Sequence, residues 1–520
     1  MSRRRSIRRV STERPQRFER SRARLSSVWI GRDRLTAGRV ARNLWPMRHL
    51  RLLALLAPVA LLPIVACEDS SGSSSGAVFS PEAGPGFEAG PTPEAGPLPD
   101  GALPDTSTAP LGVTVTVSDG STPQKNVRVI FHDASGLVTG QALTDVAGKV
   151  TVAIAPSMVT VLQKDSGQRP AVVTFVGVTD GDKLKVVSGG LSGNAGAYDV
   201  TFTGGGVVAN ASNFFVQAGN GCSANANVVD AALSVPLFTD CVAAKNAVLA
   251  TASNGAGVLG FGFVKNVDAP VAAATVAVGP LAFIAPGSTN VKATNLPSAG
   301  GVSSNAALSA ISSGQAFGLS NYTGTLGGAG LDFATPTGFA DAYQTVVRAT
   351  QVAFSFGETA LVRREATTAP ATGALATFDF ATALPFITDV TATQAVPARP
   401  DVTLTSGNAA TLATADAGIV RVSWFASAVD SSASWTIVVP PSTTSFKFPA
   451  LPADATEFEP VTNSFAVDSA TFFDASQLPN YGAAKLLPIK PAFGLDFVES
   501  NRVLPAAGTL RVSRFTPNAG

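Results

Sequence analysis

Residues 113–119 read Val-Thr-Val-Thr-Val-Ser-Asp, and this stretch decides the fold class. Val113, Val115 and Val117 alternate with small polar residues, so that one side of an extended chain is apolar and the other is polar. A period of two predicts a half-buried β-strand, and Asp119-Gly120 supplies the turn that ends it. Similar strand and turn patterns recur roughly every ten residues, which predicts an all-β protein of tandem antiparallel, Ig-like β-sandwiches.

The alternation continues through residues 111–190, which we predict to form one β-sandwich. Two runs in it, 126–131 (Asn-Val-Arg-Val-Ile-Phe) and 144–150 (Thr-Asp-Val-Ala-Gly-Lys-Val), resemble the carboxypeptidase regulatory-like and transthyretin-like β-sandwich family. The following residues, 155–159, depart from the Pro-Gly and Tyr turn that is common in this family. The resemblance implies a non-catalytic spacer or binding module, with no active-site residues to carry over.

The N-terminal residues predict an export signal. Residues 1–46 contain 14 arginines without an apolar period, and we interpret them as an extension upstream of a true start at Met47. A basic segment after Met47 precedes apolar residues 52–65, a run shorter than the ~20 residues of a transmembrane helix. Residues 47–66 are therefore predicted to be a signal peptide.

The signal peptide ends in Ile64-Val65-Ala66-Cys67, which resembles the lipobox of bacterial lipoprotein precursors. The resemblance implies cleavage before Cys67 and attachment of lipid to the Cys67 thiol, so that the protein is anchored to a membrane. An ordinary secretory signal with an incidental cysteine is the alternative. The residue after Cys67 is Glu68 and not the Asp that retains lipoproteins in the inner membrane. This favours a location in the outer membrane.

Residues 67–110 predict a disordered tether, because they contain few large apolar side chains. Glu-Ala-Gly-Pro recurs at 82–85, 88–91 and 94–97, a composition that favours an extended chain. The segment 72–76 matches the Gly-x-Ser-x-Gly pattern of a nucleophile elbow. The strand and helix that an elbow requires are not predicted on either side, so we reject the match.

The charge of the exported part argues against nucleic acid as a partner. Residues 1–66 hold 16 of the 37 basic residues and three of the 36 acidic ones, which leaves 21 basic and 33 acidic residues beyond them. A net charge of about −12 suits a solvated acidic surface, whereas phosphate binding needs clustered Lys and Arg.

Residues 196–300 predict a second β-domain that contains Cys222 and Cys241. An even pair of cysteines in an exported chain predicts a disulfide. Zinc is the rival, but two thiols and a single distant histidine do not complete its four ligands.

The Gly-x-Gly-x-x-Gly pattern of a dinucleotide-binding site occurs at residues 255–260 (Gly-Ala-Gly-Val-Leu-Gly), but the residues around it do not fit such a site. A β-like run follows it in place of the required helix, and no acidic residue lies ~20 positions later. We predict a hairpin, with Asn254-Gly255 in a type I′ turn.

Residues 301–520 predict a further β-sandwich region, of one or two units. Its clearest strands are 419–425 and 435–439, which carry Trp424 and Trp435. We expect both indoles to pack in the core, the alternative being an exposed pair that stacks on sugars. Residues 338–343 are the one segment that we expect to form a short helical turn.

The inventory of chemical groups limits the function. After cleavage His132 is the only histidine, and the alternation predicts that it faces solvent from its strand. We therefore expect no catalytic residue, no metal and no cofactor. The turn Asp180-Gly181-Asp182 is expected to be structural rather than a calcium ligand.

Two functions remain. The sequence favours a non-enzymatic, lipid-anchored envelope or surface protein for adhesion, scaffolding or ligand binding, with an envelope protein or a polysaccharide as its partner. The alternative is a polysaccharide hydrolase that uses a pair of carboxylates.

Overall fold

The computed structural model describes residues 112–517, except for short internal gaps. These gaps are 154–155, 165–168, 190–192, 204–207, 209, 227–231, 272, 299–300, 325, 327–328, 353–354, 366–373, 396–398, 407–408, 427–430, 461–464, 492–493, 496 and 499–502. The predicted extension (1–46), signal peptide (47–66) and tether (67–110), with Cys67, lie outside the described residues.

The all-β prediction is confirmed, since about 64% of the described part is strand. The described helices are single turns: α1 (Ala409–Leu412), α2 (Tyr481–Ala484) and the 3₁₀ turns η1 (Phe380–Thr382) and η2 (Thr456–Phe458). The prediction of a helical turn at 338–343 is wrong, because residues 337–339 form a non-helical turn that leads into a strand from Ala342.

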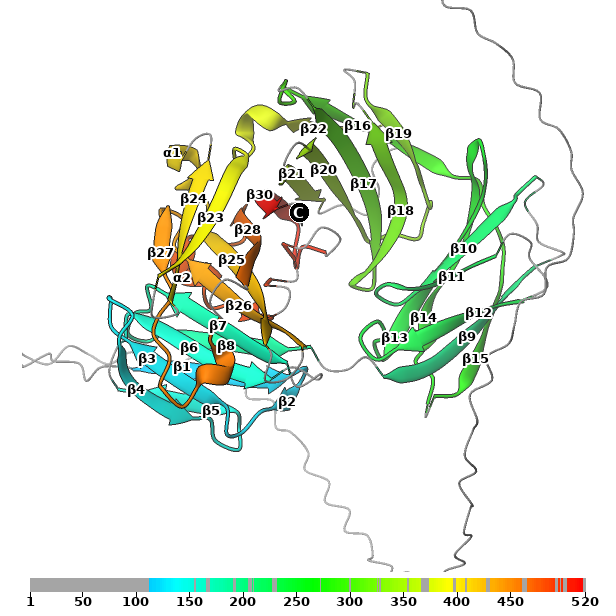
Figure 1. Ribbon diagram of the computed structural model, residues 1–520. Coiled ribbons are helices and arrows are strands. Elements are labelled where there is room, and N and C mark those ends of the chain that lie inside the picture. The colour runs from blue at the N-terminus through cyan, green and yellow to red at the C-terminus, as the bar shows by residue number, and fades with distance from the viewer. Residues whose placement is uncertain are drawn as a thin grey trace, which may run out of the picture. The chain divides into compact units, whose positions relative to one another are not determined.

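The largest element is a 12-stranded sheet, here named the long sheet (Figure 1). Its strands, in spatial order, are β18 (Gln315–Gly324), β17 (Val302–Ser312), β20 (Ala342–Val352), β21 (Ser355–Arg364), β30 (Gly508–Pro517), β28 (Phe465–Ala475), β25 (Ala417–Ala426), β26 (Ser431–Val439), β7 (Pro170–Val176), β6 (Met158–Lys164), β3 (Arg128–His132) and β4 (Val138–Leu143). Within it, β7 pairs in parallel with β26, so strands from the two ends of the described chain share one sheet.

One face of the long sheet is covered by a smaller sheet that contains the strand that opens the described chain. This β1 sheet consists of β2 (Thr122–Pro123), β1 (Val113–Asp119), β8 (Lys183–Ser188) and β29 (Pro488–Ile489), with β5 (Lys149–Val152) also paired to β1. Val113, Val115 and Val117 are fully buried there, as their alternation predicts. Their core also includes Phe473 and Leu510, and so joins the two ends of the described chain.

The opposite face of the long sheet is covered by the β24 sheet, which consists of β23 (Ile387–Ala395), β24 (Arg399–Ser406) and β27 (Ser445–Lys447). Val402 and Phe448 pack there against Ile130, Trp424 and Trp435. Both indoles are buried, as expected. The long sheet therefore has apolar side chains on both faces in this region.

The β16 sheet packs on another part of the long sheet. It consists of β19 (Leu331–Thr335), β16 (Gly287–Thr294) and β22 (Ala374–Asp379). Val291 and Phe333 share a core with Phe317 and Val347 of the long sheet.

The remaining strands form a two-sheet sandwich, here named the disulfide sandwich, and Ala247, Leu249 and Phe261 join it to the core that contains Val291 and Phe317. One sheet holds β12 (Ala232–Phe238), β9 (Asn194–Phe202) and β15 (Thr275–Leu281). The other holds β11 (Cys222–Ala226), β10 (Asn213–Ala218), β13 (Lys245–Asn254) and β14 (Gly257–Asp268). Every member of its core lies between Ala195 and Phe283.

The hairpin predicted at the glycine-rich stretch is present, since β13 pairs with β14 and Asn254 lies opposite Gly257. Its turn type differs from the prediction. A type I′ turn needs positive φ at both central residues, and here neither Gly255 nor Ala256 has it, whereas Gly257 has φ +142°. The Asn254 side chain instead accepts a hydrogen bond from the Ala256 N–H at 2.8 Å.

The sheets are mixed rather than purely antiparallel. Parallel pairs join β1 to β8, β9 to β15 and β16 to β22, in addition to β7 and β26. No helix in the described part of the chain is long and apolar enough to cross a bilayer.

Candidate functional site: a polar cleft at the end of a sandwich

A polar cleft of about 510 Å³ opens where the long sheet and the β1 sheet end. The cleft is lined by the end of β1, the loop before β3, the beginning of β3, the ends of β6 and β8, and the segment that includes η2. Its polar lining residues are Asp119, Gln124, Asn126, Arg128, Gln163, Lys164, Ser188, Asp454 and Glu457. Its volume lies within the usual range of ligand-binding sites.

Two ion pairs form one wall of the cleft. The Arg128 guanidinium donates two hydrogen bonds to the Asp454 carboxylate, at 3.0 and 2.8 Å. Lys164 Nζ lies 2.9 Å from a Glu457 carboxylate oxygen. The hydrogen bond from Arg128 lowers the pKa of Asp454, so this carboxyl is not set up as a general acid. Three acids and two bases leave the lining nearly neutral.

Gln163 lines the cleft but keeps its side-chain amide nitrogen buried. Its side chain is 8% exposed, yet its amide nitrogen has no hydrogen-bond partner among the described residues. A buried amide without a partner is costly, and such groups are rare in native structures.

His132 is not the solvent-facing residue that the alternation predicts. It does lie on the opposite side of β3 from Val129 and Phe131, but that side is also covered, and His132 is fully buried. Burial, with the nearby positive charge of Arg399, lowers the pKa of His132 to about 4. The imidazole is therefore neutral at physiological pH and enclosed in the core.

His132 belongs to a chain of buried polar side chains across four neighbouring strands of the long sheet. Its Nε2 lies 2.9 Å from the Thr160 hydroxyl, which lies 2.9 Å from the Thr174 hydroxyl. The Trp435 indole N–H donates to Thr174 at 2.9 Å. All four residues are buried, so the contacts provide internal hydrogen bonding rather than a reactive centre.

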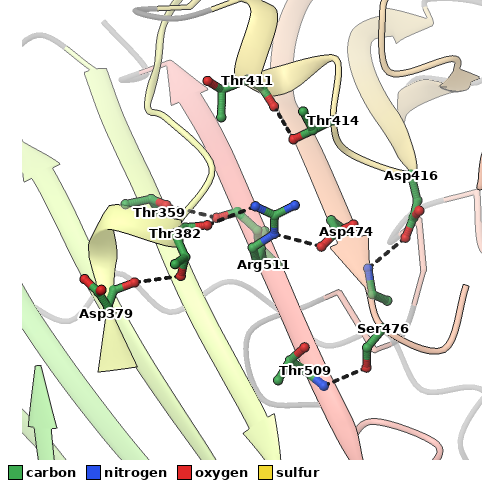
Figure 2. Close-up of polar contacts among 12 residues, drawn as sticks. Thr359, Asp379, Thr382, Thr411, Thr414, Asp416, Asp474, Ser476, Thr509 and Arg511 are labelled. Carbon is green, nitrogen blue, oxygen red and sulfur yellow. Dashed lines mark hydrogen bonds and ion pairs between the residues drawn. The ribbon is translucent and has the colours of Figure 1, made fainter. Parts of the chain in front are cut away.

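A carboxylate pair of the kind that a glycosidase needs could be sought in Asp416 and Asp474. Burial, with the nearby charge of Asp474, raises the pKa of Asp416. Figure 2 shows where both groups point: Asp474 accepts a hydrogen bond from Arg511 at 2.8 Å, and Asp416 accepts one from the Ala475 backbone N–H at 2.7 Å. Both carboxylates therefore bind neighbouring strands.

Arg511 connects this cluster to η1, since it also donates to the Thr382 carbonyl at 2.9 Å (Figure 2). Among the described residues, no group of three or more His, Cys, Asp or Glu side chains is placed to hold a metal ion.

The predicted disulfide between Cys222 and Cys241 is present, with the two Cα atoms 5.7 Å apart. Cys222 begins β11 in one sheet of the disulfide sandwich, and Cys241 follows β12 in the other. The bond therefore links the two sheets.

The turn at Asp180-Gly181-Asp182 contains an ion pair that the sequence does not reveal. Lys485 Nζ lies 2.6 Å from Asp182, with only 3% of the Lys485 side chain exposed. Lys485 also donates to the Gly177 carbonyl at 3.0 Å. The sequence offers no signal for this pair, because its members lie about 300 residues apart.

No family model and no curated protein matches this chain. The solved structures with some similarity include the Bacillus anthracis TIE protein, at 10% identity and a TM-score of 0.14, which covers 52% of this chain and 50% of that one. The chicken CNTN1 FN1–FN3 domains match at 11% identity and a TM-score of 0.12, over 61% of this chain and 89% of that one. A tetra-tandem repeat from the extending region of a large adhesion protein matches at 10% identity and a TM-score of 0.11, over 71% and 96%. This chain spans about half the length of the first of these. TM-scores this low assign no function to the chain.

Proposed function

We propose that this chain is an exported, lipid-anchored surface protein that binds a hydroxyl-rich, uncharged ligand such as a polysaccharide in the polar cleft, without transforming it. The mixed lining of amide, hydroxyl and paired charged groups, with nearly balanced charge, is the observation that carries the proposal. Sugar hydroxyls both donate and accept hydrogen bonds, and therefore suit a lining with both donors and acceptors. A strongly charged ligand would compete with the existing ion pairs.

The disulfide supports an oxidising location. Disulfides persist in secreted and surface proteins and are rare in reducing compartments. The lipobox motif at 64–67 supports anchoring through Cys67, and the predicted tether at 67–110 would hold the β-sandwiches away from the membrane.

Binding is tested by calorimetry of the full chain with a panel of soluble neutral polysaccharides. Gln163→Leu and Asp454→Ala should each weaken binding about tenfold or more, since each removes a group from the cleft. Asp268→Ala is the matched control, because Asp268 forms an exposed ion pair with Lys245 at 2.6 Å and does not line the cleft. Equal binding by all variants, or no binding to the wild type, would refute the cleft as the ligand site.

The non-enzymatic character is tested with the same polysaccharides. We expect no release of reducing ends. Turnover that is lost in Asp416→Asn or Asp474→Asn would replace this proposal by the hydrolase alternative.

The lipid anchor is tested separately, by intact mass spectrometry of membrane fractions. The mature chain should begin at Cys67 and carry lipid, and Cys67→Ala should release it from the membrane. A Cys67→Ala variant that stays bound to the membrane would exclude this anchor.

A further inference from the structure

The dipeptide Asn-Gly occurs twice in the chain, at Asn220-Gly221 and at Asn254-Gly255. An asparagine side chain can cyclise on the backbone nitrogen that follows it, because attack on the side-chain carbonyl carbon closes a five-membered ring. Glycine at the next position favours this reaction, since it has no side chain to hinder the approach. The sequence alone therefore gives the two sites the same reactivity, but the structure holds them in different ways.

Asn254 ends β13 at the tip of the β13–β14 hairpin. Its side-chain oxygen Oδ1 accepts a hydrogen bond from the Ala256 N–H at 2.8 Å. The peptide nitrogen of Gly255 lies between these two groups along the chain, so this bond folds the Asn254 side chain back over it. The side-chain carbonyl carbon is thereby held close to the atom that would attack it.

The same hydrogen bond activates the Asn254 carbonyl. Negative charge develops on Oδ1 as the Gly255 nitrogen attacks, and the Ala256 N–H is already directed at this oxygen. The leaving group, Nδ2, donates only a long hydrogen bond, 3.4 Å to the Asn210 carbonyl. Gly255 is exposed, and its N–H donates to no residue in the described part of the chain, so water can remove its proton.

Asn220 is held in a different arrangement. Its Oδ1 accepts a hydrogen bond from the Ala316 N–H of β18, at 3.4 Å. Its backbone N–H donates to the Cys241 carbonyl at 2.7 Å. The Asn220 side chain is thus directed to another strand rather than over the nitrogen of Gly221, and its carbonyl carbon is not presented to that nitrogen.

We propose that Asn254 is a site of spontaneous modification in the folded protein, and that Asn220 is protected by its contacts. The Gly255 nitrogen gives its proton to water and forms a bond to Asn254 Cγ, which closes a succinimide ring. The bond from Cγ to Nδ2 breaks, and Nδ2 takes up a proton and leaves as ammonia. Water then adds to either carbonyl of the ring and opens it, which leaves aspartate or isoaspartate at position 254.

Both products change the hairpin tip. Each carries a negative charge that asparagine lacks, and isoaspartate also adds one atom to the main chain between positions 254 and 255. Asn254 lies opposite Gly257, with only Gly255 and Ala256 in the turn. The length of such a short turn sets the register of its strands, so an extra main-chain atom loosens the end of the β13–β14 pairing.

The modification is tested by incubating the full chain at mildly alkaline pH, followed by digestion and mass spectrometry. The peptide that contains residue 254 should gain about 1 Da. Its reaction should be about tenfold or more faster than that of the peptide with residue 220. Isoaspartate should be present beside aspartate, because direct hydrolysis of the amide would give aspartate alone. In urea, which unfolds both sites, the two rates should become similar.

Gly255→Ala is the matched variant for the chemistry. Gly255 does not have positive φ, and a Cβ there would meet no atom within 4 Å, so the fold should tolerate alanine. The added methyl group hinders the attacking nitrogen and should slow the reaction about tenfold or more. The proposal would be overturned by a native chain without mass gain at residue 254, by equal native rates at the two sites, by an equal preference in urea, or by an unchanged rate in Gly255→Ala.

Discussion

At the scale of single residues, the structure shows how far alternation can be used to place a side chain. The pattern around Val129 and Phe131 correctly assigns His132 to the opposite face of its strand. It does not show that the opposite face is covered, because that cover comes from β24 and β27, more than 250 residues away. The face of a residue is local information, whereas its burial depends on distant segments.

The buried His132 should make stability fall in acid. Its folded-state pKa of about 4 lies below the ordinary value of 6.5, so the unfolded chain takes up the proton first as pH falls. The free energy of unfolding should therefore be undiminished above about pH 6.5 and fall by about 3 kcal/mol toward pH 4. Urea unfolding at about pH 7.5 and about pH 4.5 measures this loss.

The matched variant for this experiment is His132→Leu, which removes the titrating group. Between the two pH values, the free energy of unfolding of this variant should fall by about 2–3 kcal/mol less than that of the wild type, because only its carboxyl groups then take up protons. Parallel losses in the two proteins would show that His132 is protonated in the folded state as readily as in water.

The pair of Lys485 and Asp182 should be important for stability because both side chains are buried. Lys485→Met should cost about 3–5 kcal/mol, since it leaves the Asp182 carboxylate without its counter-ion. Adding Asp182→Asn should recover part of this loss, because the amide oxygen can still accept the hydrogen bond from the Thr179 N–H. Lys245→Met, in an exposed pair, should cost less than about 1 kcal/mol. Urea denaturation of the four proteins gives these energies, and equal costs for the two single variants would contradict the prediction.

At the scale of elements, the disulfide is the feature that the sequence predicts best. Two cysteines in a chain that is expected to be exported define a short list of pairings, and the apolar strands around them place both in one sandwich. The ion pair of Lys485 and Asp182 has no such signal, because charged residues are too numerous for composition to identify the pairs. The polar cleft is likewise assembled from five separate segments, so no single motif predicts it.

The disulfide should contribute about 3 kcal/mol to the stability of its sandwich, because it closes a loop with a sequence separation of 19. The double variant Cys222→Ser/Cys241→Ser should therefore unfold at lower urea concentration than the wild type. Reduction of the wild type should cause the same shift, and the double variant should not respond to reductant. Free thiols at both positions in the native, unreduced protein would disprove the bond.

At the scale of the whole molecule, period-two patterns identify strands but do not identify their partners. Residues 170–176 and 431–439 each carry an apolar strand pattern, yet nothing in either predicts that they pair in parallel. The predicted borders at 111–190, 196–300 and 301–520 stay predictions as independent folding units. The cores offer a way to test them, because one core is contiguous in sequence and another is not.

The core between the two sheets of the disulfide sandwich uses only residues between 195 and 283, whereas Ala247, Leu249 and Phe261 pack in the core that contains Val291 and Phe317. A fragment 193–285 should still fold when oxidised, with these three side chains newly exposed. The core under β1 also needs residues from β25, β28 and β30, and a fragment 112–190 would keep only 12 of the 27 buried residues of that core. We therefore expect cooperative urea unfolding, followed by circular dichroism, for 193–285 and none for 112–190. Co-expression of the fragment 112–190 with residues 409–517 should restore cooperative urea unfolding. A cooperative transition of 112–190 alone would instead support an independent carboxypeptidase regulatory-like domain, with the β7–β26 pairing as a contact between finished domains.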